Sequence, residues 1–229
     1  KVNSNLVMVN ISGNAVAMPW VKSVPSIVQG WFLGTEAGNA LASILFGDSN
    51  PSGKLPFSFY AKLEDNGAHA LGAYPGGETV EYKEGLFVGY RWLDKHRIKP
   101  LFSFGHGLSY TTFKFGKAVA DKRVMSADET LKITIPVKNT GKVAGAEVVQ
   151  LYVQDVKSSL PRPIKELKGF NKVWLEPGEE KEVTFVLNKD DLSFFDDVKH
   201  EWVAEAGDFI AHIGNSSTEI ASKVKFILK

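Results

Sequence analysis

Two hydrophobic patterns divide the chain. Near its start, apolar residues form short continuous runs at residues 6–11 (LVMVNI) and 27–31 (IVQGW). Such runs are typical of strands that are buried on both faces of a parallel sheet. A third apolar run at residues 54–59 (KLPFSF) predicts another strand. These runs therefore indicate a mostly parallel sheet.

A helix is predicted between the second and third of these strands. Apolar residues recur there at helical spacing, Thr35 is the expected N-terminal cap, and Gly47 is the expected stop. The order strand, strand, helix, turn, strand is that of an open α/β sheet with a helix on one face. Residues 1–60 are therefore predicted to be half of an α/β sandwich.

The pattern changes twice more along the chain. Residues 61–77 are polar and rich in glycine, and residues 81–92 (EYKEGLFVGYRW) read as a strand, so we predict a linker and connecting segment over residues 61–107. From residue 108 to residue 229 the hydrophobic period becomes two, in about seven short strands separated by turns. The strand number and length favour an immunoglobulin-like or fibronectin type III-like β-sandwich over a small barrel.

The amino-acid composition and charge of the chain exclude several kinds of binding partner and site. The 229 residues carry 27 basic and 26 acidic side chains, a net charge of +1, which gives no support to a nucleic-acid or anionic-membrane partner. No apolar run approaches the ~20 residues that a membrane span requires. There are no cysteines, which excludes disulfides and thiolate metal sites. We expect a periplasmic or secreted location rather than a cytoplasmic one. The polar start without an initiator Met is what we expect of a fragment or a processed piece.

Several long motifs resemble glycoside hydrolase family 3. They correspond to the second half of its α/β sandwich domain and to its fibronectin type III-like domain. The motifs are GNAVAMPW (13–20), VQGWFLGTEAGNALASILFGDSNPSGKLPFSF (28–59), YKEGLFVGYRWLD (82–94), PLFSFGHGLSYTTF (100–113), LKITIPVKNTGKVAGAEVVQLYVQD (131–155) and KELKGFNKVWLEPGEEKEVTFVL (165–187).

The resemblance implies a retaining exo-acting β-glycosidase, most often a β-glucosidase that hydrolyses terminal β-D-glucosyl residues by double displacement. No cofactor is implied. Its substrate would be a β-linked oligosaccharide or glycoside, and the partner of this chain would be the N-terminal barrel part of the same enzyme. A homo-oligomer is left open.

The resemblance also implies where the catalytic carboxylates lie. In this family an Asp of the barrel is the nucleophile and a Glu on a loop of the α/β sandwich is the acid/base, and a retaining pair lies about 5–5.5 Å apart. No match to the nucleophile motif occurs here, and the acid/base loop precedes the first strand of this chain. Both residues are therefore expected upstream, no catalytic residue is assigned here, and the chain alone is not expected to hydrolyse glycosides.

Glu84 is the one candidate residue beside the active site. A carboxylate in the apolar stretch EYKEGLFVGYRW costs free energy unless it is paired or used. It either flanks the active site or ties down the stretch through Arg91 or backbone hydrogen bonds, and the second interpretation is favoured.

Other candidates are predicted to be structural. Pro51 and Gly53 suit a tight turn, although such a loop can also line a site. The five histidines lack metal-ligand spacing, so no metal site is predicted, and His106 is expected to pack in a loop.

The five tryptophans are expected in the core, while Tyr74 is a better candidate for exposure. An alternative function is a non-catalytic carbohydrate-binding module, which would need an exposed aromatic strip on one sheet face. A purely structural fibronectin-like module is the other alternative.

Overall fold

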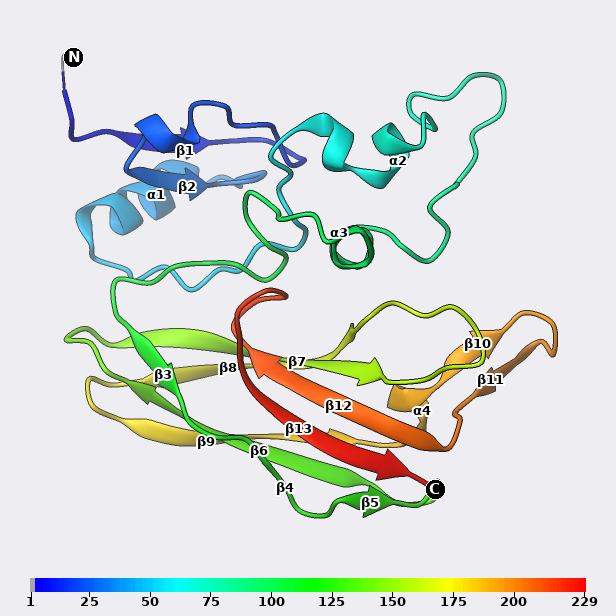
Figure 1. Cartoon of the computed structure of the whole chain (residues 1–229). Coiled ribbons are helices and arrows are strands. Elements are labelled where there is room, and N and C mark those ends of the chain that lie inside the picture. The colour runs from blue at the N-terminus through cyan, green and yellow to red at the C-terminus, as the bar shows by residue number, and fades with distance from the viewer. Residues whose placement is uncertain (1–2) are drawn as a thin grey trace.

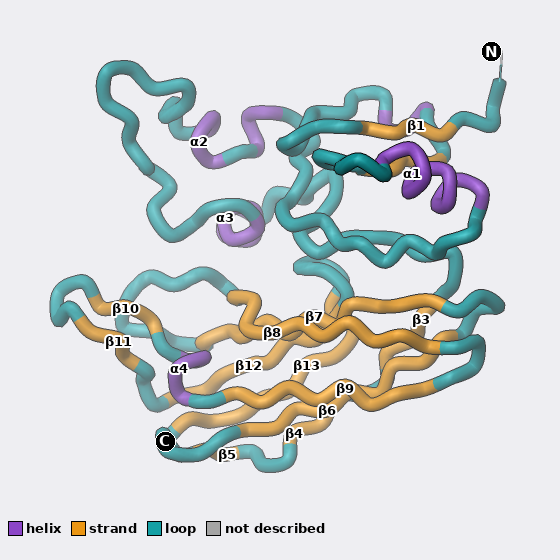
Figure 2. Tube along the Cα trace, turned by 180° about the vertical axis from the view of Figure 1, so that it is seen from behind, coloured by secondary structure: helices purple, strands orange, loops and turns teal. Residues whose placement is uncertain are grey.

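The computed structural model describes residues 3–229, and it places a small helical and parallel-sheet part above a β-sandwich (Figure 1). Residues 1 and 2, which begin the predicted first domain, lie outside the described residues. Most of the regular structure is β, with a few short helices, and Figure 2 shows the same two parts from behind. No helix within residues 3–229 has the length and apolar character needed to cross a membrane.

The upper part begins with the predicted parallel pair. Strands β1 (Val7–Asn10) and β2 (Ser26–Gln29) are parallel, and helix α1 (Ala37–Phe46) follows them. Gly47 ends this helix with φ +85°, a left-handed conformation that glycine adopts at little cost. The cap predicted at Thr35 is wrong: the N-cap is Glu36, and no side chain caps the helix.

The upper part is not a complete α/β sandwich. β1 and β2 form a two-stranded sheet, and no residue of β1, β2 or α1 is fully buried, so the strands are not enclosed on both faces by this chain. The predicted strand at residues 54–59 is reduced to one bridge between Phe59 and Phe102. Pro56, which has no N–H to donate, interrupts this segment and prevents a longer ladder.

The strand predicted over residues 81–92 is also wrong. The stretch forms a turn that leads into helix α3 (Tyr90–His96). Gly85 (φ +55°) and Gly89 (φ +63°) both have positive φ, which glycine adopts at little cost and which an extended strand does not contain. Trp92 is buried within α3. The upper part also contains 3₁₀ helices η1 (Val21–Ser23) and η2 (Leu63–Asp65) and helix α2 (Gly67–Ala70).

The lower part confirms the predicted β-sandwich. A five-stranded sheet in the order β5-β13-β12-β7-β8 faces a four-stranded sheet in which β6 pairs with β3, β4 and β9. All of these pairs are antiparallel except β5–β13. The strands are β3 (Phe113–Phe115), β4 (Val119–Ala120), β5 (Val124–Met125), β6 (Leu131–Asn139), β7 (Gly145–Asp155), β8 (Glu166–Leu175), β9 (Glu180–Leu187), β12 (Gly207–Gly214) and β13 (Ile220–Leu228).

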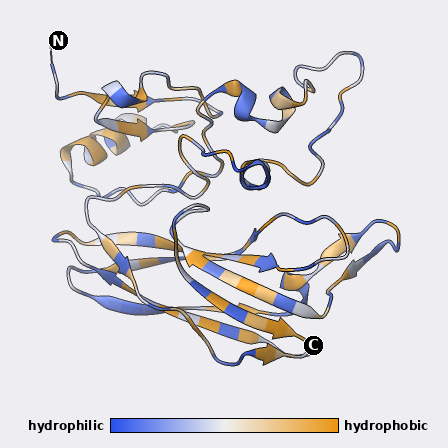
Figure 3. Cartoon of the chain, viewed as in Figure 1, coloured by the Kyte–Doolittle hydropathy of each residue, from blue (hydrophilic) through white to orange (hydrophobic). Residues whose placement is uncertain are grey.

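Alternating side chains build the core of the sandwich. Every second residue of β6, from Leu131 to Val137, is fully buried, and β7 contributes Val149, Leu151 and Val153. Figure 3 shows the alternation of apolar and polar residues along β13. Helix α4 (Lys189–Leu192) and the hairpin of β10 (Phe194–Asp196) and β11 (Glu201–Val203) extend beyond the two sheets. The period-two pattern therefore identified this part correctly.

Candidate functional site

Glu84 lies in the turn between α2 and α3 and is half-buried. Its carbonyl oxygen accepts the N–H of Phe87 at 3.0 Å, which closes the turn. Gly67 of α2 packs against this turn: a Cβ at Gly67 would lie 3.4 Å from the Glu84 Cβ and 3.0 Å from the Trp92 ring. Glu84 is therefore held where the two helices meet.

Arg91, one of the two kinds of partner predicted for the Glu84 carboxylate, pairs with another residue. Helix α3 directs Arg91 toward the sandwich, where its Nη2 lies 3.3 Å from Oε1 of Glu166. Glu166 also binds Arg162 at 2.9 Å, so one β8 carboxylate joins two guanidinium groups. Within residues 3–229 the Glu84 carboxylate has no ion pair. Its position beside an active site stays a prediction.

Polar and aromatic groups surround Glu84. Burial raises the pKa of Tyr60, and the negative charge of Glu84 adds to the rise, whereas a hydrogen bond with Asn66 opposes it. The phenol is thus held in its protonated form. The indole N–H of Trp92 is buried without a hydrogen-bond partner among the described residues. A neutral hydroxyl, a free N–H and a carboxylate therefore lie in one small region.

Helix α3 rests on the outer face of the five-stranded sheet. The Tyr90 hydroxyl accepts the N–H of Leu167 at 2.9 Å, and the Tyr90 ring packs edge-on against Tyr152, with centroids 5.8 Å apart. Asp94 of the same helix pairs with Lys165. These contacts fix the direction of α3, and with it the Glu84 turn.

The turn at residues 50–54 is a second attachment to the sandwich. Asn50 donates to the Ala144 carbonyl at 2.9 Å and accepts from the Ser109 hydroxyl at 2.9 Å. Lys54 lies 2.6 Å from Glu147, and both side chains are largely buried. This turn therefore has the structural role predicted for it, because its side chains join the two parts of the chain.

Gln150 of β7 is the centre of the interface. Its Nε2 donates to the carbonyl oxygens of Gly105, at 3.0 Å, and Asn215, at 2.6 Å, while its Oε1 accepts from the Tyr152 hydroxyl at 2.6 Å. A side chain at position 105 would overlap Gln150. This buried network was not found from the sequence, because its members lie far apart along the chain and no local pattern marks them.

The tryptophans do not all lie in the core. Trp92 is buried as predicted, but Trp174 is 53% exposed and Trp202 is 70% exposed, so the prediction is wrong for these two. Trp174 shares the outer face of β8 with Phe170, whereas Val173 and Leu175 face the core. The alternation of inward and outward side chains along residues 168–175 (KGFNKVWL) could have predicted that Trp174 is exposed. The predicted exposure of Tyr74 is confirmed.

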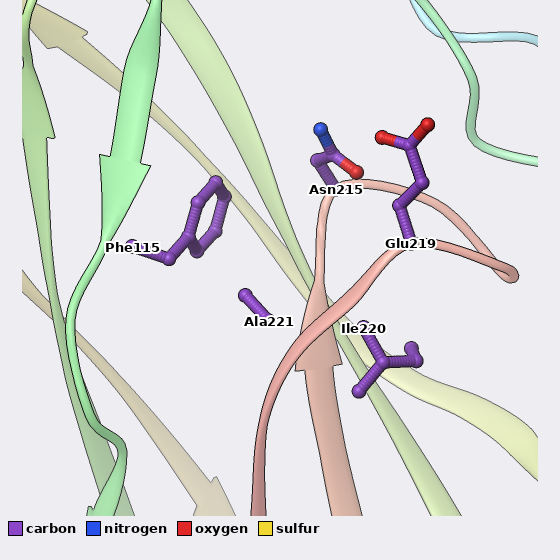
Figure 4. Close-up of a pocket in the computed structure, with 5 residues that line it drawn as sticks. All are labelled: Phe115, Asn215, Glu219, Ile220 and Ala221. Carbon is purple, nitrogen blue, oxygen red and sulfur yellow. The ribbon is translucent and has the colours of Figure 1, made fainter.

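Two pockets among residues 3–229 each have one carboxylate in their lining, Glu219 in the first and Glu205 in the second. The pocket in Figure 4 lies between β3 and the turn that joins β12 to β13. Glu219 is its single carboxylate, whereas retaining hydrolysis requires two. Residues 3–229 contain no group of three His, Asp or Glu side chains that could hold a metal ion. His106 stacks on Phe102 with centroids 5.4 Å apart, which confirms its packing role, and burial lowers its pKa.

Comparison with known proteins gives the family. The sequence model of the glycosyl hydrolase family 3 C-terminal domain matches residues 1–110, and that of the fibronectin type III-like domain matches residues 147–217. A β-glucosidase of Bacteroides ovatus is 54% identical over 229 residues, which cover 99% of this chain and 31% of the relative. The chain belongs to glycoside hydrolase family 3.

Two further comparisons agree with this assignment. The thermostable β-glucosidase B of Acetivibrio thermocellus is 49% identical over 97% of this chain and 29% of its own length. The crystal structure of the β-glucosidase of Kluyveromyces marxianus in complex with glucose matches with a TM-score of 0.92 and 43% identity, over 99% of this chain and 27% of that one. The chain thus spans less than a third of the length of each of these relatives.

Proposed function

We propose that this chain is the C-terminal part of a retaining exo-acting β-glycosidase, with β-glucosidase as the favoured activity. The observation that carries the proposal is the match of nearly the whole chain to β-glucosidases, at up to 54% identity among the relatives above. The glucose complex of the Kluyveromyces marxianus enzyme supports glucose as the sugar released.

In this proposal the reaction is a double displacement. A carboxylate attacks the anomeric carbon while a carboxylic acid protonates the leaving oxygen, and water then hydrolyses the glycosyl-enzyme intermediate with the second group acting as base. Both groups belong to the part of the enzyme upstream of this chain. In this proposal the residues of this chain support that site, and none of their carboxylates takes part in the reaction.

The same proposal accounts for the open sheet of the upper part. β1, β2 and α1 form the second half of an α/β sandwich, and upstream strands and helices of the same polypeptide complete it. A parallel pair with no fully buried residue fits this role, because two strands alone are marginally stable in water. The sandwich domain is attached to the segments that follow this half, through the Lys54–Glu147 pair and the hydrogen bond from Gln150 to Gly105.

Hydrolysis of an aryl β-glucoside tests the proposal. We expect activity from a polypeptide that contains this chain together with its upstream region, and none from the 229-residue chain. A folded longer polypeptide that leaves aryl β-glycosides intact would overturn it, as would turnover by the chain alone.

A carbohydrate-binding role is the second candidate. The exposed Phe170 and Trp174 on one face of β8 are the aromatic strip that such a role requires. Electrophoresis through gels that contain a soluble β-glucan tests it. Retardation that disappears in Trp174→Ala would support this candidate, and unchanged migration of the parent chain would reject it.

A further inference from the structure

The turn at residues 80–88, which precedes helix α3, has an exposed apolar surface. Four large apolar side chains between residues 80 and 88 are 58–84% exposed. They are Val80, Tyr82, Leu86 and Val88. Exposed apolar side chains that cluster in this way mark sites of interaction with another protein surface.

The turn is preformed rather than loose. The N–H of Gly85 donates to the Tyr82 carbonyl at 3.1 Å, and the N–H of Phe87 donates to the Glu84 carbonyl at 3.0 Å. Phe87 is half-buried, and the ammonium of Lys95 lies 3.6 Å from the centre of its ring. Leu86 and Val88, on either side of Phe87, are therefore presented outward by a fixed backbone.

We propose that the outward side chains of residues 80–88 are a docking surface for the upstream part of the same enzyme. This inference rests on the proposed function. Most of the length of the relatives lies outside the matched region, so a large partner surface belongs to the same polypeptide. The turn is also continuous with an interface already described, since Gly89 leads directly into α3 on the sandwich.

Charge specifies the chemistry of the partner surface. Residues 80–88 contain two glutamates and one lysine, so their net charge is −1. Lys83 is paired with Glu81 at 3.0 Å, which leaves the remaining acidic charge unpaired within the turn. An apolar surface with a basic rim is complementary to this turn, because opposite potentials across an interface fix its register and exclude other partners.

Thiol labelling tests the inference, because the chain contains no cysteine. Tyr82→Cys and Val88→Cys are compared with Val198→Cys, a control at a position that is 82% exposed on the β10–β11 hairpin. In the 229-residue chain all three should react at similar rates. In the longer enzyme, the first two should react at least about tenfold more slowly, which corresponds to about 1.4 kcal/mol in favour of the covered state. Val80→Cys provides a second variant if either fails to fold.

Three outcomes are decisive. Labelling of positions 82 and 88 as fast as position 198 in the longer enzyme would overturn the inference, even if that enzyme hydrolyses aryl β-glucosides. Protection in an inactive longer enzyme would support the docking surface while rejecting the proposed function. Protection that already occurs in the chain alone and grows with its concentration would assign the surface to a second copy and would also overturn the inference.

Discussion

Replacing Gln150 with leucine should loosen the attachment between the two parts. The change keeps a side chain of similar size but removes two buried hydrogen bonds, with Gly105 and Tyr152, and one partly buried bond, with Asn215. The carbonyls of Gly105 and Asn215 and the hydroxyl of Tyr152 then lose their partner. A buried polar group left without a partner costs about 1–3 kcal/mol, so the loss of these three bonds together should cost about 3 kcal/mol.

Differential scanning calorimetry of the 229-residue chain measures this cost. For a chain of this size, about 1 kcal/mol shifts Tm by about 2–4 °C, so Gln150→Leu should lower Tm by about 6–12 °C. Tyr152→Phe removes one of the three bonds and should cost about a third as much. Thr184→Val is the control, because its hydroxyl pairs with Thr134 in an exposed position, where substitutions change stability by less than about 0.5 kcal/mol. A Gln150→Leu variant that melts within about 2 °C of the parent would refute the reasoning.

Two other predictions concern single titratable residues. Burial, with the charges of Lys223 and Lys165, lowers the pKa of His212 to about 4, below its value near 6.5 in the unfolded chain. The unfolded state therefore binds the proton more readily, and the stability from His212 is complete above about pH 6.5 and is lost as the pH falls toward 4, by at most about 3 kcal/mol. His212→Gln should flatten the fall in Tm between pH 7 and pH 4.5, and equal falls in both proteins would contradict this assignment. Glu84→Gln in the longer enzyme should reduce stability or kcat on an aryl β-glucoside modestly, whereas a loss of about 10⁴-fold or more would identify Glu84 as the acid/base.

The sequence predicted those parts of the fold that depend on local alternation. In β6, Leu131 and Ile133 face the core because side chains alternate along a strand, and this period is visible in the sequence. The same rule applied to Val173 and Leu175 would have placed Trp174 outside. The exposure of Phe170 and Trp174 was thus predictable from the sequence. The prediction for Trp174 was wrong because tryptophan was assigned to the core by residue type alone.

The parts that failed depend on backbone exceptions and on distant partners. Pro56 limits one predicted strand to a single bridge, and Gly85 and Gly89 convert another into a turn before a helix. Arg91 pairs with Glu166, which is distant in the sequence, rather than with the nearby Glu84. Nothing local distinguishes these two carboxylates, because only the direction of α3 selects the partner.

The two parts of the chain differ in how they are stabilised. The sandwich encloses fully buried apolar side chains from both sheets, whereas β1, β2 and α1 contain no fully buried residue. Burial of apolar area is the main favourable contribution to folding, so the sandwich can supply its own stability and the parallel layer has little of its own. The upper part has a few buried side chains of its own, such as Phe59, Trp92 and Leu93. It is also attached to the sandwich through Gln150, the Lys54–Glu147 pair and α3. An upstream partner that covers β1, β2 and residues 80–88 would add the missing burial from above, which places the Glu84 turn between a rigid support and the rest of the enzyme.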